Sequence, residues 1–147
     1  MKFVFSSFEP ADVVALDLQE TQVGQLGPYE PVRNLKHGIE LKAMGPAWTL
    51  RNDTGDVLAC SGFGEVFPGQ QATIWALIAD VTAARFAVVR FMRARLAEMP
   101  YHRIEALARA SHPKECRLLE AVGFGRPHRL RKWGPAAEDH ILYERII

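Results

Sequence analysis

The chain has 147 residues, of which 48% are hydrophobic and 24% are charged, and its formal net charge is +1. This composition is typical of one globular domain spanning residues 1–147 and excludes a disordered chain. The small net charge gives no argument for a nucleic acid or an acidic partner. The two cysteines, Cys60 and Cys116, are too few for a disulfide framework, and we expect both to be reduced and partly buried.

The N-terminal segment, MKFVFSSFEP, lacks both the apolar core and the cleavage signature of a signal peptide. No apolar run approaches the ~20 residues that a membrane helix needs. We therefore expect a cytoplasmic protein without membrane contacts.

The first half of the chain predicts one strand, two helices and then a meander of strands. The expected ranges are a strand at 3–5, helices at 11–19 and 31–44, and strands at 47–52, 57–66 and 71–79. Ser7 or Glu9 is expected to cap the first helix. Turn residues separate the meander strands, and the apolar run QATIWALIA indicates a central strand.

The second half predicts helices at 81–99 and 112–122, and strands at 103–109, 126–133 and 140–146. The longer helix is apolar on more than one side toward its start, so we expect it to pack deeply. A strand, a helix and a strand in sequence imply a right-handed parallel crossover. Gly123 ends the shorter helix by adopting positive φ, and Phe124 packs into the core. The fold class is α/β, with a mixed sheet: an antiparallel meander, a parallel crossover and a C-terminal hairpin.

Basic residues cluster in two segments. They are Arg85, Arg90, Arg93 and Arg95 in the first, and Arg126, Arg129, Arg131 and Lys132 in the second. The second segment alternates like an edge strand whose charges guard against edge-to-edge pairing. Trp133, at the tip of the hairpin, is a candidate anchor for a protein partner. Nucleic-acid binding is not expected, because it needs a broader patch with aromatic residues between the charges.

Three segments, in order and at the right spacing, resemble the GNAT superfamily of N-acetyltransferases. They are EPADVVAL (residues 9–16), HRIEALARASHPKECRLLEAVGF (102–124) and DHILYERI (139–146). Among GNAT-like proteins the chain is most similar to the short ones of tailed bacteriophages, which share an apolar strand with Trp and a loop without glycines. The resemblance implies a GNAT-like fold over nearly the whole chain.

The same resemblance implies acetyl-CoA as the cofactor, held where strands 71–79 and 103–109 separate. Pantetheine would pair with the backbone of Leu77, Ile78 and Ala79. The pyrophosphate would lie at the start of the long helix, on Thr82, Ala83, Ala84 and Arg85. An amine would then attack the thioester directly, helped by a general base and a general acid.

The chain departs from the family pattern at two places. The loop aligned with the family's pyrophosphate motif, Asp80–Arg85, contains no glycine, and the Asp80 carboxylate would repel a phosphate. Leu119 occupies the position of the family's thiolate-protonating Tyr, and His112 occupies that of a common Asn.

Three residues are candidates for catalysis. Glu65, near the end of the second meander strand, is a candidate general base, although an exposed strand glutamate is the alternative. His112 is a candidate helix cap or acceptor base. Tyr143, in the last strand, is a candidate acid. His112 and Cys116 are four residues apart, but no second pair has ligand spacing, so no metal site is expected; a Cys-His nucleophile pair stays open.

Two functions follow from these observations. The first is an N-acyltransferase that moves an acetyl group from acetyl-CoA to an amine on a small molecule or a protein. The alternative is a catalytically degenerate GNAT-fold phage protein that binds another protein, in the virion or in the host cytoplasm. The sequence leaves a homo-oligomer open.

Overall fold

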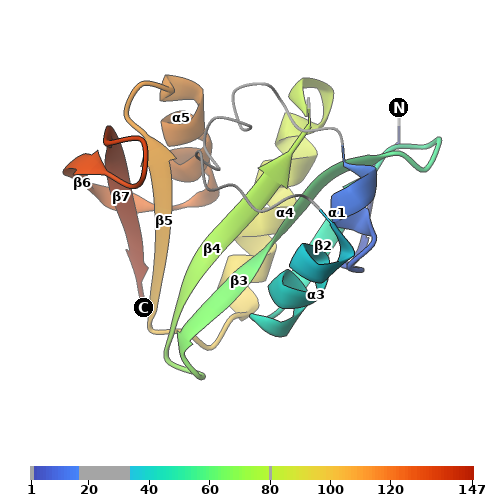
Figure 1. Ribbon diagram of the computed structural model, residues 1–147, viewed down its shortest axis with the longest axis horizontal. Coiled ribbons are helices and arrows are strands. Elements are labelled where there is room, and N and C mark those ends of the chain that lie inside the picture. The colour runs from blue at the N-terminus through green and yellow to red at the C-terminus, as the bar shows by residue number, and fades with distance from the viewer. Residues whose placement is uncertain (1, 17–33, 80) are drawn as a thin grey trace. The chain divides into compact units, whose positions relative to one another are not determined.

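The structure, a computed structural model, describes residues 2–16, 34–79 and 81–147 (Figure 1). Its elements, in chain order, are β1 (Val4–Ser7), α1 (Asp12–Ala15), α3 (Leu35–Ala43), β2 (Ala47–Arg51), β3 (Val57–Phe67), β4 (Gln71–Ile78), a 3₁₀ turn η1 (Thr82–Ala84), α4 (Arg85–Glu98), β5 (Arg103–Arg109), α5 (Pro113–Val122), β6 (Gly125–Trp133) and β7 (Glu138–Ile146).

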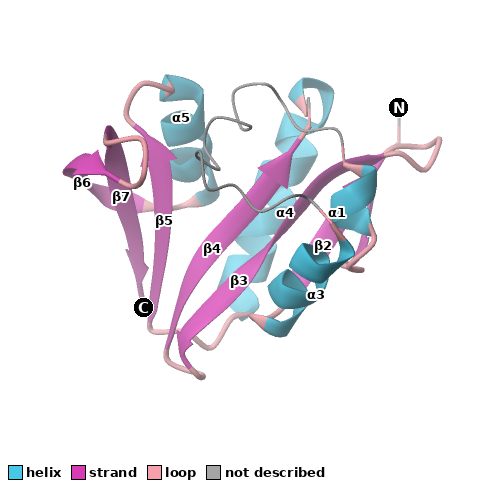
Figure 2. Cartoon of the chain, in the orientation of Figure 1, coloured by secondary structure: helices cyan, strands magenta, loops and turns pink. Residues whose placement is uncertain are grey.

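The strands in the described ranges form one mixed sheet with the order β1-β2-β3-β4-β5-β7-β6 (Figure 2). β4 and β5 pair in parallel, whereas β1 with β2, β2 with β3, β5 with β7, and β6 with β7 are antiparallel. The predicted mixed α/β sheet with a parallel crossover and a C-terminal hairpin is therefore confirmed.

The chain contacts divide the molecule into two compact units. One comprises Met1–Gly64 and Ile74–Arg85, and the other comprises Glu65–Thr73 and Phe86–Ile147. Strands β3 and β4 each contribute to both units.

The first unit is organised around the buried carboxylate of Asp12, which is 5% exposed. It accepts hydrogen bonds from the Glu9 amide at 3.0 Å, from Thr49 Oγ1 at 2.6 Å and from Arg51 Nη2 at 2.5 Å. Burial raises the pKa of Asp12, but these donors and the Arg51 charge outweigh burial, so the net pKa lies below 3.8. A single carboxylate thus ties the start of α1 to strand β2.

Apolar side chains surround this network and form the core of the first unit. The buried members are Phe8, Val13, Leu16, Leu41, Val57, Cys60, Leu77 and Ala79. Trp75 of β4 packs against them, with its ring edge-on to Phe8 at 5.6 Å. Helix α3 lies close to the chain before α1 at Gly38, where an added Cβ would lie 2.2 Å from the Pro10 carbonyl oxygen.

The second unit is built on β5, which pairs with β7 along its whole length, from Arg103 opposite Ile146 to Arg109 opposite His140. Helix α5 follows β5 and ends at Gly123, whose φ of 119° closes the helix in the left-handed region. Phe124 comes next and is 4% exposed. The predicted helix end at Gly123 and the burial of Phe124 are both confirmed.

Several predicted details are wrong. Neither Ser7 nor Glu9 caps α1 through its side chain; the Asp12 carboxylate accepts the hydrogen bond of the Glu9 amide instead.

The long helix begins only at Arg85, after the 3₁₀ turn, and its start is exposed. Phe86 is 74% exposed, and the buried residues of the helix lie in its second half. Helix α3 covers the described part of the predicted helix at 31–44, and residues 31–33 lie outside the described residues.

In the described part of the chain, no helix combines the length and the apolar character that crossing a membrane requires.

We predict that Asp12→Ala lowers the free energy of unfolding by about 2–4 kcal/mol, because it leaves buried donors without their charged acceptor. Urea denaturation at neutral pH measures this loss. Asp53→Ala, in the exposed turn after β2, is the matched control and should change stability little.

The difference in free energy of unfolding between the wild type and Asp12→Ala should become smaller at acidic pH. A carboxyl whose pKa is lowered by folding stabilises the protein above its unfolded pKa and loses that effect as pH falls through its folded pKa. The wild type therefore loses the Asp12 contribution below pH 3.8, whereas the variant has none to lose. A deficit that is independent of pH would contradict this assignment.

Candidate functional site

Strands β4 and β5 pair over only part of their lengths. Among the described residues their ladder consists of three pairs, from Gln71 opposite Arg103 to Thr73 opposite Glu105, all within the second unit. β4 then runs on to Ile78, and β5 to Arg109. The parallel ladder therefore covers the first three residues of each strand.

The residues expected to pair with pantetheine lie in the first unit. Leu77 and Ala79 are 6% and 9% exposed and belong to its core. The Ala79 N–H donates to the Leu58 carbonyl oxygen at 2.8 Å, so this amide is already engaged. Ile78 is half-buried and is the last residue of β4.

The expected pyrophosphate loop forms the 3₁₀ turn before α4. Thr82 and Ala83 are exposed, whereas Ala84 is 1% exposed and donates its N–H to the Val81 carbonyl oxygen. Arg85, which is exposed, begins a helix of 14 residues. Small exposed side chains, a helix start and a cation fit a phosphate group even without glycines; Asp80 lies outside the described residues.

Glu65 lies near the end of β3, where its side chain is exposed. Its carboxylate accepts a hydrogen bond of 2.7 Å from the hydroxyl of Tyr101, a residue that is 1% exposed. Burial, together with the Glu65 carboxylate, raises the pKa of Tyr101 well above 10.0. The tyrosine therefore stays protonated and holds one Glu65 oxygen in place, while the carboxylate remains open to solvent.

His112 is the residue before α5, but its side chain makes no capping hydrogen bond. The expectation that His112 caps the helix through its side chain is therefore wrong. Its Nδ1 lies 2.8 Å from the hydroxyl oxygen of Ser111 instead, on an exposed turn. Cys116 has its Sγ 3.9 Å from the Arg109 carbonyl oxygen.

Tyr143 is 3% exposed and joins β7 to α5. Its hydroxyl donates to Glu120 Oε1 at 3.1 Å. Burial raises the pKa of Tyr143 well above 10.0, and the neighbouring Cys116 thiol and Glu120 carboxyl raise it further. This cluster of Tyr143, Cys116 and Glu120 holds a protonated phenol against the helix.

The three catalytic candidates all lie in the second unit, but they do not converge on one point. Tyr101, the partner of Glu65, precedes β5, whereas His112 follows it. Strand β5 has seven residues, so roughly 20 Å of strand separates its two ends. Tyr143 lies opposite Ala106, one residue beyond the last pair of the parallel ladder.

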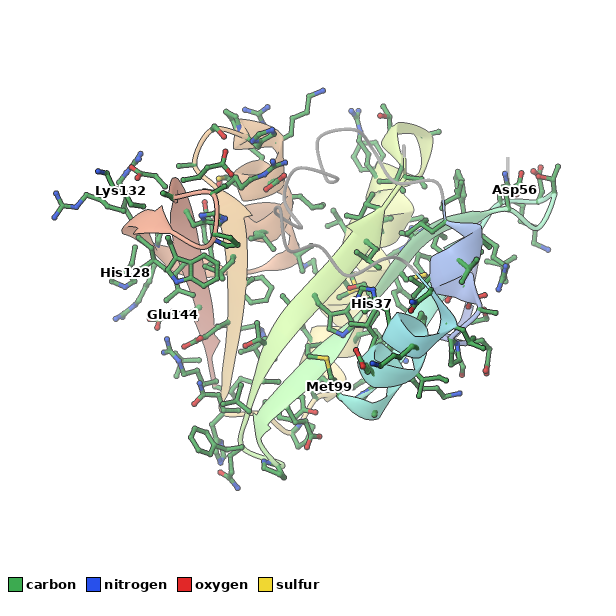
Figure 3. The ribbon with its side chains drawn as sticks, viewed as in Figure 1. His37, Asp56, Met99, His128, Lys132 and Glu144 are labelled. Carbon is green, nitrogen blue, oxygen red and sulfur yellow. The ribbon has the colours of Figure 1, made fainter. Side chains whose placement is uncertain are left out.

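A third polar group lies beside the end of the ladder. Arg103 donates from Nε to Glu105 Oε1 at 2.8 Å and from Nη1 to Glu144 Oε2 at 2.5 Å. Figure 3 labels Glu144 on β7. Two carboxylates share one guanidinium, so the group carries a net negative charge that would attract an ammonium group.

Sequence reasoning missed the partners of these residues. Tyr101 and Glu65 are 36 positions apart, and Arg103 and Glu144 are 41 apart, so no local pattern links them. The one sequence signal for the second contact was the alternation along 103–109 and 140–146. If these two segments are paired as strands, Arg103 and Glu144 come close. Within the described ranges, no group of three or more His, Cys, Asp or Glu residues could hold a metal ion.

We predict that neither Tyr101 nor Tyr143 ionises in the folded protein near pH 10, because the pKa of each is raised. Removing either residue, with Tyr101→Phe or Tyr143→Phe, should leave the phenolate absorbance step of the native protein near pH 10.0 unchanged. In denaturant, where all tyrosines ionise, the phenolate absorbance step of each variant should be smaller by the contribution of one of the chain's three tyrosines. A smaller step in the native state would show that the hydroxyl is not buried as described.

Comparison with known proteins identifies the fold. No protein-family model matches the sequence, and no curated protein matches it. Among solved structures, a GNAT-family acetyltransferase from Bacillus anthracis is 16% identical, with a TM-score of 0.72 over 99% of this chain and 95% of that one. Mutant forms of the spermidine/spermine N-acetyltransferase from Vibrio cholerae are 15% identical, with a TM-score of 0.67 over 99% and 95%.

A third similar structure is the ribosomal-protein-S5-alanine acetyltransferase from Vibrio fischeri, which is 17% identical. Its TM-score is 0.68 over 98% of this chain and 92% of that one. At such low identities the likeness establishes fold and leaves function to the site. Almost the whole chain aligns in each case, so the protein has the fold of the GNAT acetyltransferases.

Proposed function

We propose that the protein is an N-acyltransferase that transfers an acetyl group from acetyl-CoA to an amine. The observation that carries this proposal is the match of 97–99% of the chain to acetyltransferase structures. Two of these neighbours are named for spermidine/spermine and for the alanine of ribosomal protein S5, so the acceptor class that we propose is an amine on a small molecule or on a protein.

Acetyl-CoA supplies the thioester that an amine attacks. We propose that Thr82, Ala83 and Arg85 hold its pyrophosphate at the start of α4, where the helix dipole and the guanidinium favour negative charge. Pantetheine would follow the end of β4 near Ile78, although the engaged Ala79 amide reduces the donors on offer there.

Glu65 is the candidate general base of the proposed reaction; with Tyr101 it lies at the start of the β4–β5 ladder, whereas Ile78 is at the opposite end of β4. Its carboxylate is exposed, and Tyr101 fixes one of its oxygens, so the other oxygen is available to accept a proton from an amine. Tyr143, the candidate acid for the leaving thiolate, lies beside the end of the parallel ladder, but its buried hydroxyl already donates to Glu120 and its raised pKa opposes proton transfer to a thiolate. His112 lies at the other end of β5, so it and Glu65 cannot serve one reacting centre.

The experiment measures CoA release from acetyl-CoA with spermidine and with a peptide amine as acceptors. We expect Glu65→Gln to reduce kcat by about 100-fold or more, in line with the loss of a general base. Glu40→Gln, on the exposed face of α3, is the matched control and should retain full activity. If Glu65→Gln retains activity and His112→Gln loses it, the general base is His112, at the other end of β5, and not Glu65.

A second function has its own support. The loop Asp80–Arg85 contains no glycine, and Leu119 occupies the position of the family's Tyr, which favours a GNAT-fold protein that binds a partner without CoA chemistry. The backbone of His102 donates its N–H to the Gln70 carbonyl oxygen and accepts the Ile147 N–H. Three exposed apolar side chains belong to these segments: Val66 is 50%, Phe67 60% and Ile147 67% exposed. This alternative includes the phage virion or host-interaction role.

Thermal unfolding with acetyl-CoA separates the two functions. A ligand at ~100 times its dissociation constant adds ~2.7 kcal/mol of stability. The acyltransferase should show a clear rise in Tm that Arg85→Gln diminishes. An unchanged Tm at millimolar acetyl-CoA or CoA would favour the partner-binding protein.

A further inference from the structure

Strand β6, at the edge of the sheet beside β7, carries a feature that acyl transfer does not use. A recess of about 570 Å³ opens on this strand and its turn. Its lining residues are Arg129, Leu130, Arg131, Lys132, Trp133 and Asp139. Figure 3 shows His128 and Lys132 on the outer side of the same strand. The recess lies entirely within the second unit.

The charge in the recess is mostly positive and only partly neutralised. Asp139 accepts Arg129 Nη1 at 2.8 Å and the Lys132 amide at 3.1 Å. These two hydrogen bonds, with the charges of Arg129 and Arg131, lower the pKa of Asp139. Within the described ranges, the Arg126, Arg131 and Lys132 side chains have no hydrogen bond or salt bridge to another residue. These cations are therefore available to an anionic ligand.

An exposed aromatic ring lies among these cations. Trp133 is 45% exposed, and its ring meets that of His140 edge-on, with centroids 5.1 Å apart. His140 is itself 8% exposed, so it gives Trp133 a fixed support. A large aromatic ring held in this way and open to solvent is a stacking surface for another planar group.

The backbone explains why sequence alternation did not reveal this arrangement. The β6–β7 register shifts between Leu130 and Trp133, and Lys132 has a φ of 50°. A bulge of this kind breaks the two-residue period, so the alternation expected along this edge strand does not continue beyond Leu130. Arg131, Lys132 and Trp133 instead line one recess.

We propose that this recess binds single-stranded nucleic acid, with a base stacked on Trp133 and phosphates neutralised by Arg131 and Lys132. A sequence-independent site for single strands combines these two features, an aromatic platform and a basic track. Arg126, which is exposed, lies about 20 Å further along the same strand. A duplex is disfavoured because its bases are already stacked on one another. The proposal does not depend on acyl transfer, and it reverses the expectation from sequence that the chain does not bind nucleic acid.

The test measures fluorescence anisotropy of a short labelled oligothymidylate, with the matching duplex and heparin as comparison ligands. We expect the full chain to bind the single strand more tightly than the duplex. Trp133→Leu should weaken binding about tenfold, as loss of one stacked base implies, and Trp133→Phe should restore most of it. Arg131→Gln should reduce the slope of log affinity against log salt by about 0.7, the value for one phosphate contact on a single strand.

Arg93→Gln, an exposed arginine of α4, is the matched control and should leave the affinity unchanged. The melting temperature of each variant shows that it is folded. Three results would each overturn the proposal: no binding at low salt, equal binding of the duplex and the single strand, or heparin binding that Trp133→Leu weakens equally. The last result would identify a general polyanion or acidic-protein site.

Discussion

The carboxylate of Asp12 is the constraint on which the first unit depends. It is almost fully buried, yet it stays charged because an amide, a hydroxyl and a guanidinium from two separate segments point at it. A buried charge is tolerated only with such partners, so the start of α1 and strand β2 must occupy one arrangement for the carboxylate to be satisfied. The apolar core of this unit forms around that arrangement.

In the second unit, strand β5 has the corresponding role. It is paired with β7 along its length and with β4 only at its start, so its later residues lie next to β7 and beneath α5. The polar groups collect on either side of this change: Tyr101 with Glu65 before the strand, and Tyr143 with Glu120 beside α5. The strand therefore decides which candidates can act together, and it separates Glu65 from His112.

Elements with a clear period or a clear stop were predictable from sequence. The strand at Arg103–Arg109 has the predicted bounds, and Gly123 ends α5 because that position requires positive φ. Side-chain roles were less predictable, since Glu65 finds Tyr101 only through the tertiary fold. The bulge at Lys132 was hidden as well, because a non-glycine residue with positive φ leaves no compositional signal. The sequence showed that the loop before α4 contains no glycine, but it did not predict that this loop forms a 3₁₀ turn.

Burial also gives the two free thiols different chemistry. Cys60 is fully enclosed beside Thr49, and enclosure raises its pKa to about 12, whereas Cys116 on α5 is only half-buried. Thiolate is the reactive form, so an alkylating reagent reaches Cys60 only when the first unit opens. The rate of Cys60 alkylation consequently reports how often the part of the molecule around Asp12 opens.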